Sequence, residues 1–193
     1  MRGIVDTNPA FRVLPIAMAG GVLETIQFES VLGAGEQLSI SAIVVVGVVL
    51  GPPVGWILLY AGAWLVEMSC RLLRGQADSR EVRAALAWSS VPLLATIPIW
   101  IIRAVLLGRE LFTFAKPSLL ANPTLAYILI ATFIPELLLQ IWWLVITVKA
   151  LGEVQRFSAW RALNSLLLLT APPVLLVVIL LIAAYFLLKN LLY

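Results

Sequence analysis

The sequence predicts an all-α, polytopic membrane protein with five transmembrane helices, the second of which is long and bent by prolines. Three observations support this prediction. Apolar residues make up 62% of the 193 residues, charged residues make up 12%, and the mean hydropathy is +1.05. Soluble domains carry about 25% charged residues, and a soluble domain of this length has too small an interior to bury so much apolar surface. We therefore expect residues 1–193 to form one membrane domain.

Five apolar runs approach or exceed the ~20 residues that a helix needs to cross ~30 Å of hydrocarbon. The predicted spans are 11–28, 38–73, 84–107, 124–148 and 162–188. Every span contains proline, which removes a backbone donor and displaces the carbonyl four residues earlier. The displaced carbonyls could line a path for an ion or solute, as in broken-helix transporters. Alternatively, the kinks only shape a compact bundle.

The second run is long enough to cross the membrane once or twice, and Pro52-Pro53 lies in its middle. One crossing places nine basic residues on the N-terminal side and four on the other, whereas two crossings divide them six against seven. The positive-inside rule favours the unequal division. The sequence thus predicts a bacterial cytoplasmic membrane protein with a cytoplasmic N-terminus and an external C-terminus.

The first predicted inner loop is the most charged segment. Asp78 and Glu81 have the spacing of a capping box, so the third helix is expected to begin at Ser79. Glu67 precedes Arg71 by four residues, which favours a local ion pair on a helix. The loop arginines could bind anionic lipid headgroups or an acidic cytoplasmic partner, although the orientation signal alone would explain them. These residues are Arg71, Arg74, Arg80 and Arg83.

Gly47, Gly51 and Gly55 lie four residues apart in the second span. Glycine at this spacing leaves a flat groove that another helix can approach closely. The groove could bind a partner or a second copy of the chain. It could equally be filled by the protein's own helices.

Glu136 lies near the middle of the fourth span, where an ionisable group costs about 3 kcal/mol or more unless it is paired, protonated or hydrated. Arg103 is a candidate partner, but helical rise separates the two in depth by roughly 10 Å. A direct pair therefore requires the arginine side chain to reach inward. Glu136 is either a functional intramembrane acid or a structural glutamate.

Several classes of site are absent from the sequence. The chain has no histidine and one cysteine, Cys70, which excludes Ser-His-Asp and Cys-His catalysis, thiolate cages and an internal disulfide. We identify no catalytic residue, metal site, cofactor site, phosphate loop or nucleic-acid signature. Any intramembrane enzyme would depend on carboxylates, Ser/Thr, Lys or Cys70.

The stretch from Leu72 to Pro92 carries a family resemblance: a helix ends near a glycine, a short polar loop follows, and the next helix reaches a Ser-x-Pro. The glycine spacing of the second span, residues 6–9 before the first span, and residues 148–151 and 157–162 add to it. The chain resembles the Yip family, the Ypt/Rab-interacting membrane proteins, and specifically its bacterial members. The resemblance implies five spans and a cytoplasmic N-terminus.

Eukaryotic members of that family act in vesicle traffic and contact Rab GTPases, largely through long N-terminal regions. Only residues 1–12 precede the first apolar run here, so a Rab-type role is not expected. Some bacterial members are thought to accompany ATP-driven exporters. We therefore expect a non-enzymatic accessory subunit that contacts membrane lipids and other subunits or itself. The alternative is a small transporter or channel with Glu136 in a proline-kinked pathway.

Overall fold

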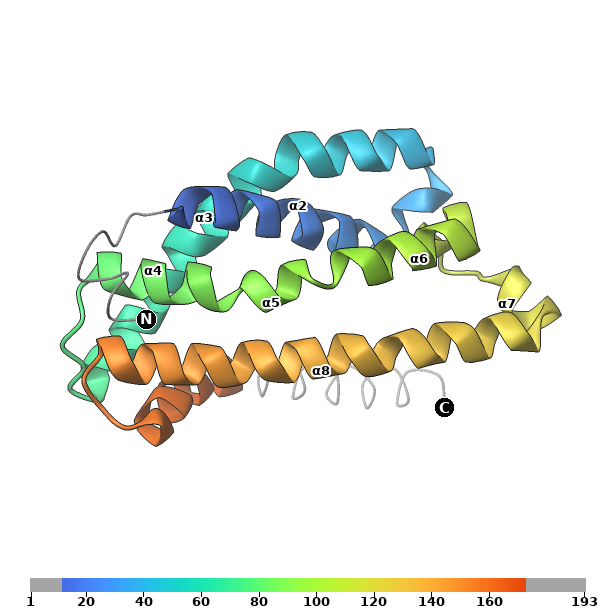
Figure 1. The fold of residues 1–193 in the computed structure, drawn as a ribbon. Coiled ribbons are helices and arrows are strands. Elements are labelled where there is room, and N and C mark those ends of the chain that lie inside the picture. The colour runs from blue at the N-terminus through green and yellow to red at the C-terminus, as the bar shows by residue number, and fades with distance from the viewer. Residues whose placement is uncertain (1–11, 173–193) are drawn as a thin grey trace, which may run out of the picture.

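The computed structural model describes residues 12–172, and these form helices joined by short turns (Figure 1). The elements are α2 (Val13–Val31), η1 (Ala34–Glu36), α3 (Ile40–Leu72), α4 (Ser79–Ser89), α5 (Val91–Leu94), α6 (Ile97–Leu107), η2 (Gly108–Phe112), α7 (Pro117–Ala121) and α8 (Pro123–Val154). Residues 159–172 form a further helix. No strand occurs within 12–172, in agreement with the predicted all-α class.

Two of the described helices, α3 and α8, are long and apolar enough to cross a membrane, and a bent pair of helices would make a third span. Helix α3 has 33 residues and runs unbroken through Pro52-Pro53, so the second apolar run forms one helix of about 50 Å. Helix α2 has 19 residues and includes Glu24 and Glu29. The predicted fifth span, 162–188, extends beyond the described residues, and the count of five spans remains a prediction.

The predicted third span, 84–107, differs from the structure, which breaks it into α4, α5 and α6 with a bend of 41°. Pro92 and Pro98 lack the N–H groups that would continue the helix. Hydroxyl groups take up carbonyls beside the breaks instead: Ser90 Oγ donates to Ala87 O at 2.7 Å and Thr96 Oγ1 to Leu93 O at 2.6 Å. Local side-chain bonds of this kind compete with the helical ladder.

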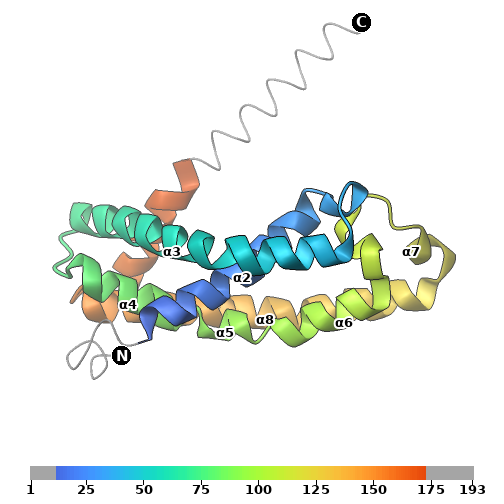
Figure 2. The ribbon, with the colours of Figure 1, turned by 90° about the horizontal axis from the view of Figure 1, so that it is seen from above.

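Helix α2 crosses α3 (Figure 2) and packs mainly against it, with further contacts to α4 and α5, and α4 and α5 in turn pack against α8. Two hydrophobic clusters hold this arrangement. The first joins α3, α4, α8 and the helix of residues 159–172, around Cys70, Val82, Leu151 and Ala162. The second joins α3, α6, η2 and α8 at the opposite end, around Ile43, Leu107, Phe112 and Leu129.

The connecting segments gather at two ends of the molecule (Figure 1). Residues 73–78 and 155–158 lie together at one end. We call it the basic end because Arg74 and Arg156 belong to these segments and Arg71 lies beside them. Residues 32–39 and 108–122 lie at the opposite end. There Arg109 Nε donates to Gly35 O at 2.7 Å, and the Phe114 N–H donates to Glu36 Oε1 at 3.2 Å, which links the two segments.

The capping box predicted at the start of α4 is confirmed. The Asp78 N–H donates to Glu81 Oε2 at 3.3 Å, Asp78 Oδ1 accepts from the Arg80 N–H, and α4 begins at Ser79. These bonds satisfy N–H groups that have no partner within the helix. Residues next to this boundary therefore determine where α4 begins.

Candidate functional site

The glycine groove of α3 is filled by α2. The contacts are Gly47 with Ile26, Gly51 with Val22, and Gly55 with Ala17. A Cβ added at Gly51 or Gly55 would overlap backbone atoms of α2, so the helices approach as closely as glycine permits. Gly21 of α2 has no room for a Cβ from the other side. Of the two uses expected for this groove, the structure shows the internal one.

Arg103 of α6 and Glu136 of α8 form a direct ion pair, with Nη2 2.5 Å from Oε2. Their side chains are 6% and 11% exposed. The second carboxylate oxygen, Oε1, accepts a hydrogen bond from Trp100 Nε1 at 3.3 Å, and Arg103 Nε donates to Thr132 Oγ1 at 2.9 Å. Buried charges require such additional bonds, because their desolvation otherwise exceeds their mutual attraction.

The Arg103 guanidinium is also enclosed by aromatic rings. Its Cζ lies 4.2 Å from the ring centroid of Phe133 and 5.6 Å from that of Trp100. Nη2 makes its contact with Glu136 as a charge pair without an aligned N–H···O hydrogen bond. The arginine side chain thus reaches Glu136 directly, and its contacts with Thr132, Phe133 and Trp100 hold it there.

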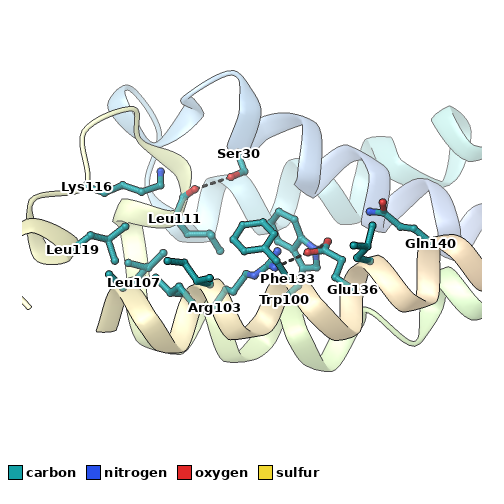
Figure 3. Close-up of a pocket in the computed structure, with 14 residues that line it drawn as sticks. Ser30, Trp100, Arg103, Leu107, Leu111, Lys116, Leu119, Phe133, Glu136 and Gln140 are labelled. Atoms are coloured by element: carbon teal, nitrogen blue, oxygen red, sulfur yellow. Dashed lines mark hydrogen bonds and ion pairs between the residues drawn. The ribbon is translucent and has the colours of Figure 1, made fainter. Parts of the chain in front are cut away.

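A cavity of about 690 Å³ surrounds this ion pair. Figure 3 shows Arg103 and Glu136 facing each other between α6 and α8, with Lys116 and Leu119 on the far side of the cavity. The walls are mainly aliphatic and aromatic, and their charged members are Arg103, Lys116 and Glu136. A mostly apolar cavity with a few converging polar groups is the usual form of a small-molecule site.

The inner-loop arginines do not form one cluster with a common partner. Arg71 pairs with Glu67 at 2.5 Å, as the sequence predicted, and the Ser79 hydroxyl donates to the same carboxylate. The Arg83 guanidinium lies 4.6 Å from the centroid of the Tyr60 ring. The other two, Arg74 and Arg80, have exposed side chains. Their contact with lipid or with a cytoplasmic partner remains a prediction.

Gln155 links the two connecting segments of the basic end, and sequence reasoning did not identify it. It is 1% exposed, and its Oε1 accepts from the Ala77 N–H at 3.0 Å. A Cβ at Gly75 would overlap the end of the Gln155 side chain, so a larger residue there would displace the Gln155 amide. A single glutamine after an apolar helix is typical of an exposed turn, so no sequence pattern marked it.

Trp100 and Thr132 were missed as well, although a signal for both was present. Trp100 lies three residues before Arg103, and Thr132 lies four residues before Glu136. Residues at these spacings share one face of a helix. A search for polar residues three or four positions away from each charged residue would therefore have found both.

In the comparison with protein families, the model of the Yip1 domain matches residues 8–188. The chain belongs to the Yip1 family. This confirms the resemblance that the glycine and proline patterns indicated. No curated protein and no solved structure matches significantly. Within residues 12–172, this Yip1-family chain gathers no group of three or more His, Cys, Asp or Glu side chains that could hold a metal ion.

Proposed function

We propose that this Yip1-family protein is a non-enzymatic membrane protein that acts as an accessory or organising subunit of a larger assembly. The observation that supports the proposal is the exposure of α8: in its most apolar stretch, 6% of the residues are buried by the rest of the described chain. Ile134, Leu138 and Ile141 lie on one exposed face of this helix. With the α3 groove filled by α2, we assign partner contact to this face of α8.

The family resemblance suggests an ATP-driven exporter as the partner class. We further propose the topology that the charge count favours, with five spans in a bacterial cytoplasmic membrane and a cytoplasmic N-terminus. In this orientation the basic end faces the cytoplasm. Its exposed arginines, Arg74 and Arg80, are then available to anionic lipid or to a cytoplasmic domain of the partner.

Site-specific photocrosslinking tests the assignment of the partner face. A photoreactive residue at Leu138, on the exposed face, is expected to yield crosslinks to another protein or to a second copy. The same residue at Val22, which lies against Gly51, serves as the matched control and should yield only internal crosslinks. Purification in gentle detergent with mass analysis completes the test, and recovery of a lone monomer would contradict the proposal.

The second candidate function is a small transporter or channel, and the ion pair in its cavity is the observation that favours it. An ionisable pair at this depth is a common feature of proton and solute pathways. Purified protein in liposomes should then move an ion or solute, and Glu136→Gln should reduce the rate. Unchanged transport in Glu136→Gln would exclude a role for this acid.

A further inference from the structure

We propose that the cavity between α6 and α8 binds one acyl chain of an anionic phospholipid, with the phosphate of the headgroup at Lys116. The cavity holds about 690 Å³, within the range of small-molecule sites. Its lining along α8 runs from Ala126 to Gln140, which is about 21 Å of helix. One leaflet of hydrocarbon is about 15 Å thick, so an acyl chain of ordinary length fits the long dimension of the cavity.

The walls between the two ends of the cavity suit an acyl chain. Leu107, Leu119, Leu129 and Leu137 line it from three elements, α6, α7 and α8. Within the cavity, Arg103 and Glu136 compensate each other's charge, and Trp100 and Thr132 bond to Glu136 Oε1 and Arg103 Nε. An apolar chain therefore gains burial along most of its length without breaking a hydrogen bond.

The charge of the ligand follows from the three charged side chains of the lining. Arg103 and Glu136 neutralise each other at 2.5 Å, which leaves Lys116 as the remaining charge. A cationic amphiphile would need the aromatic faces beside Glu136, but Arg103 already covers Phe133 at 4.2 Å. The cavity thus favours an anionic ligand over a cationic one.

Lys116 has the hydrogen-bonding capacity to hold a headgroup. Its ammonium carries three donors, of which two are directed at the carbonyl oxygens of Glu110 (3.0 Å) and Thr113 (2.5 Å). These bonds hold Nζ beside the cavity that Lys116 lines and leave one N–H for a phosphate oxygen. The segment of residues 108–122 lies at the end of the molecule, where a lipid headgroup would be found.

Native mass spectrometry of the full chain tests this assignment. Purified protein is supplied with equal amounts of phosphatidylglycerol, of phosphatidylcholine with identical acyl chains, and of the corresponding free fatty acid. We expect one bound phosphatidylglycerol in preference to the other two. Lys116→Gln should lower that preference about fivefold, the effect of removing one lysine near an anionic headgroup. Lys149→Gln, at the basic end, is the matched control and should leave it unchanged.

A second pair of variants tests the position of the acyl chain. Ala126 lines the cavity, whereas Ala131 is exposed on the same helix and lies outside the lining. Ala126→Trp should abolish the bound lipid, and Ala131→Trp should retain it. Circular dichroism and gel filtration establish whether each variant folds. If Ala126→Trp does not fold, the lipid preference of Lys116→Gln still tests the proposal. Equal retention of the two phospholipids, preference for the fatty acid, no bound lipid, or equal loss in both tryptophan variants would overturn the proposal.

Discussion

Arginine occupies the left-handed backbone position at the end of α3 and of α8, the two longest of the described helices. Arg74 follows α3 with φ 64°, and Arg156 follows α8 with φ 57°. Each turn is closed by a backbone hydrogen bond to the residue five positions earlier, from the Gly75 N–H to Cys70 O at 2.9 Å and from the Phe157 N–H to Gly152 O at 3.0 Å. Glycine usually fills this position. The chain thus keeps positive charge at the basic end at a conformational cost.

Replacing Arg74 with glycine is expected to stabilise the protein by about 0.5–1 kcal/mol, because a Cβ is unfavourable at positive φ and glycine removes it. Thermal unfolding in detergent measures the change. Arg80→Gly is the matched control: it removes the same side chain from the first turn of α4, where positive φ is not required, and should not stabilise. If Arg74→Gly is instead less stable, the interactions of the arginine side chain stabilise the protein by more than its positive φ destabilises it.

Removing one charge of the Arg103–Glu136 ion pair is expected to lower the free energy of unfolding. Arg103→Met leaves a buried carboxylate without its cation and should cost about 3 kcal/mol or more. The double variant Arg103→Met/Glu136→Met removes both charges and should recover most of that loss. Arg80→Met, which removes an arginine with an exposed side chain, is the control and should change stability by less than about 1 kcal/mol. Additive losses in the double variant would mean that the two residues are not coupled.

Among the elements, the contact of α2 with α3 depends on glycine at particular positions. Gly51→Ala places a methyl group on the α2 backbone near Val22, and the resulting separation should cost about 1–3 kcal/mol. Gly62 lies on the same helix with open space around its Cβ position, so Gly62→Ala should instead stabilise by up to about 1 kcal/mol. Thermal unfolding of the two variants compares them directly. Equal effects would contradict a close α2–α3 contact.

Elements with strong local signals were predictable from the sequence, and elements shaped by tertiary contacts were not. Helices α3 and α8 followed from uninterrupted apolar length, and the start of α4 followed from Asp78 and Glu81. The run 84–107 was predicted as one span because its hydropathy is continuous. Proline and hydroxyl groups break it, and hydropathy does not register either effect. Arg103 was a candidate partner of Glu136 from the sequence, but whether the two make contact also depended on the packing of α6 beside α8, which helical rise along one chain does not supply.

In the whole molecule, the connecting segments lie at two ends, so the basic residues counted in the sequence can be assigned to one end or the other. The segments 73–78 and 155–158 lie together at the basic end, and 108–122 lies at the other (Figure 1). A membrane normal that follows α3 and α8 would place these two groups on opposite faces. The positive-inside rule then assigns the basic end to the cytoplasm, so the structure and the charge distribution make one joint prediction of topology.

Single cysteines in a Cys70→Ala background test that prediction in intact cells. Gln76 and Ala115 are exposed residues at the basic and opposite ends. An impermeant maleimide should label Ala115→Cys directly and Gln76→Cys only after the membrane is opened. The unsubstituted chain, whose Cys70 is buried, is the control and should not react in either state. Tags on the two termini should likewise respond differently, because an odd number of crossings leaves them on opposite faces. Equal labelling at 76 and 115 would contradict the transmembrane direction of α3 and α8, whereas equal response of the termini alone would contradict only the count of five.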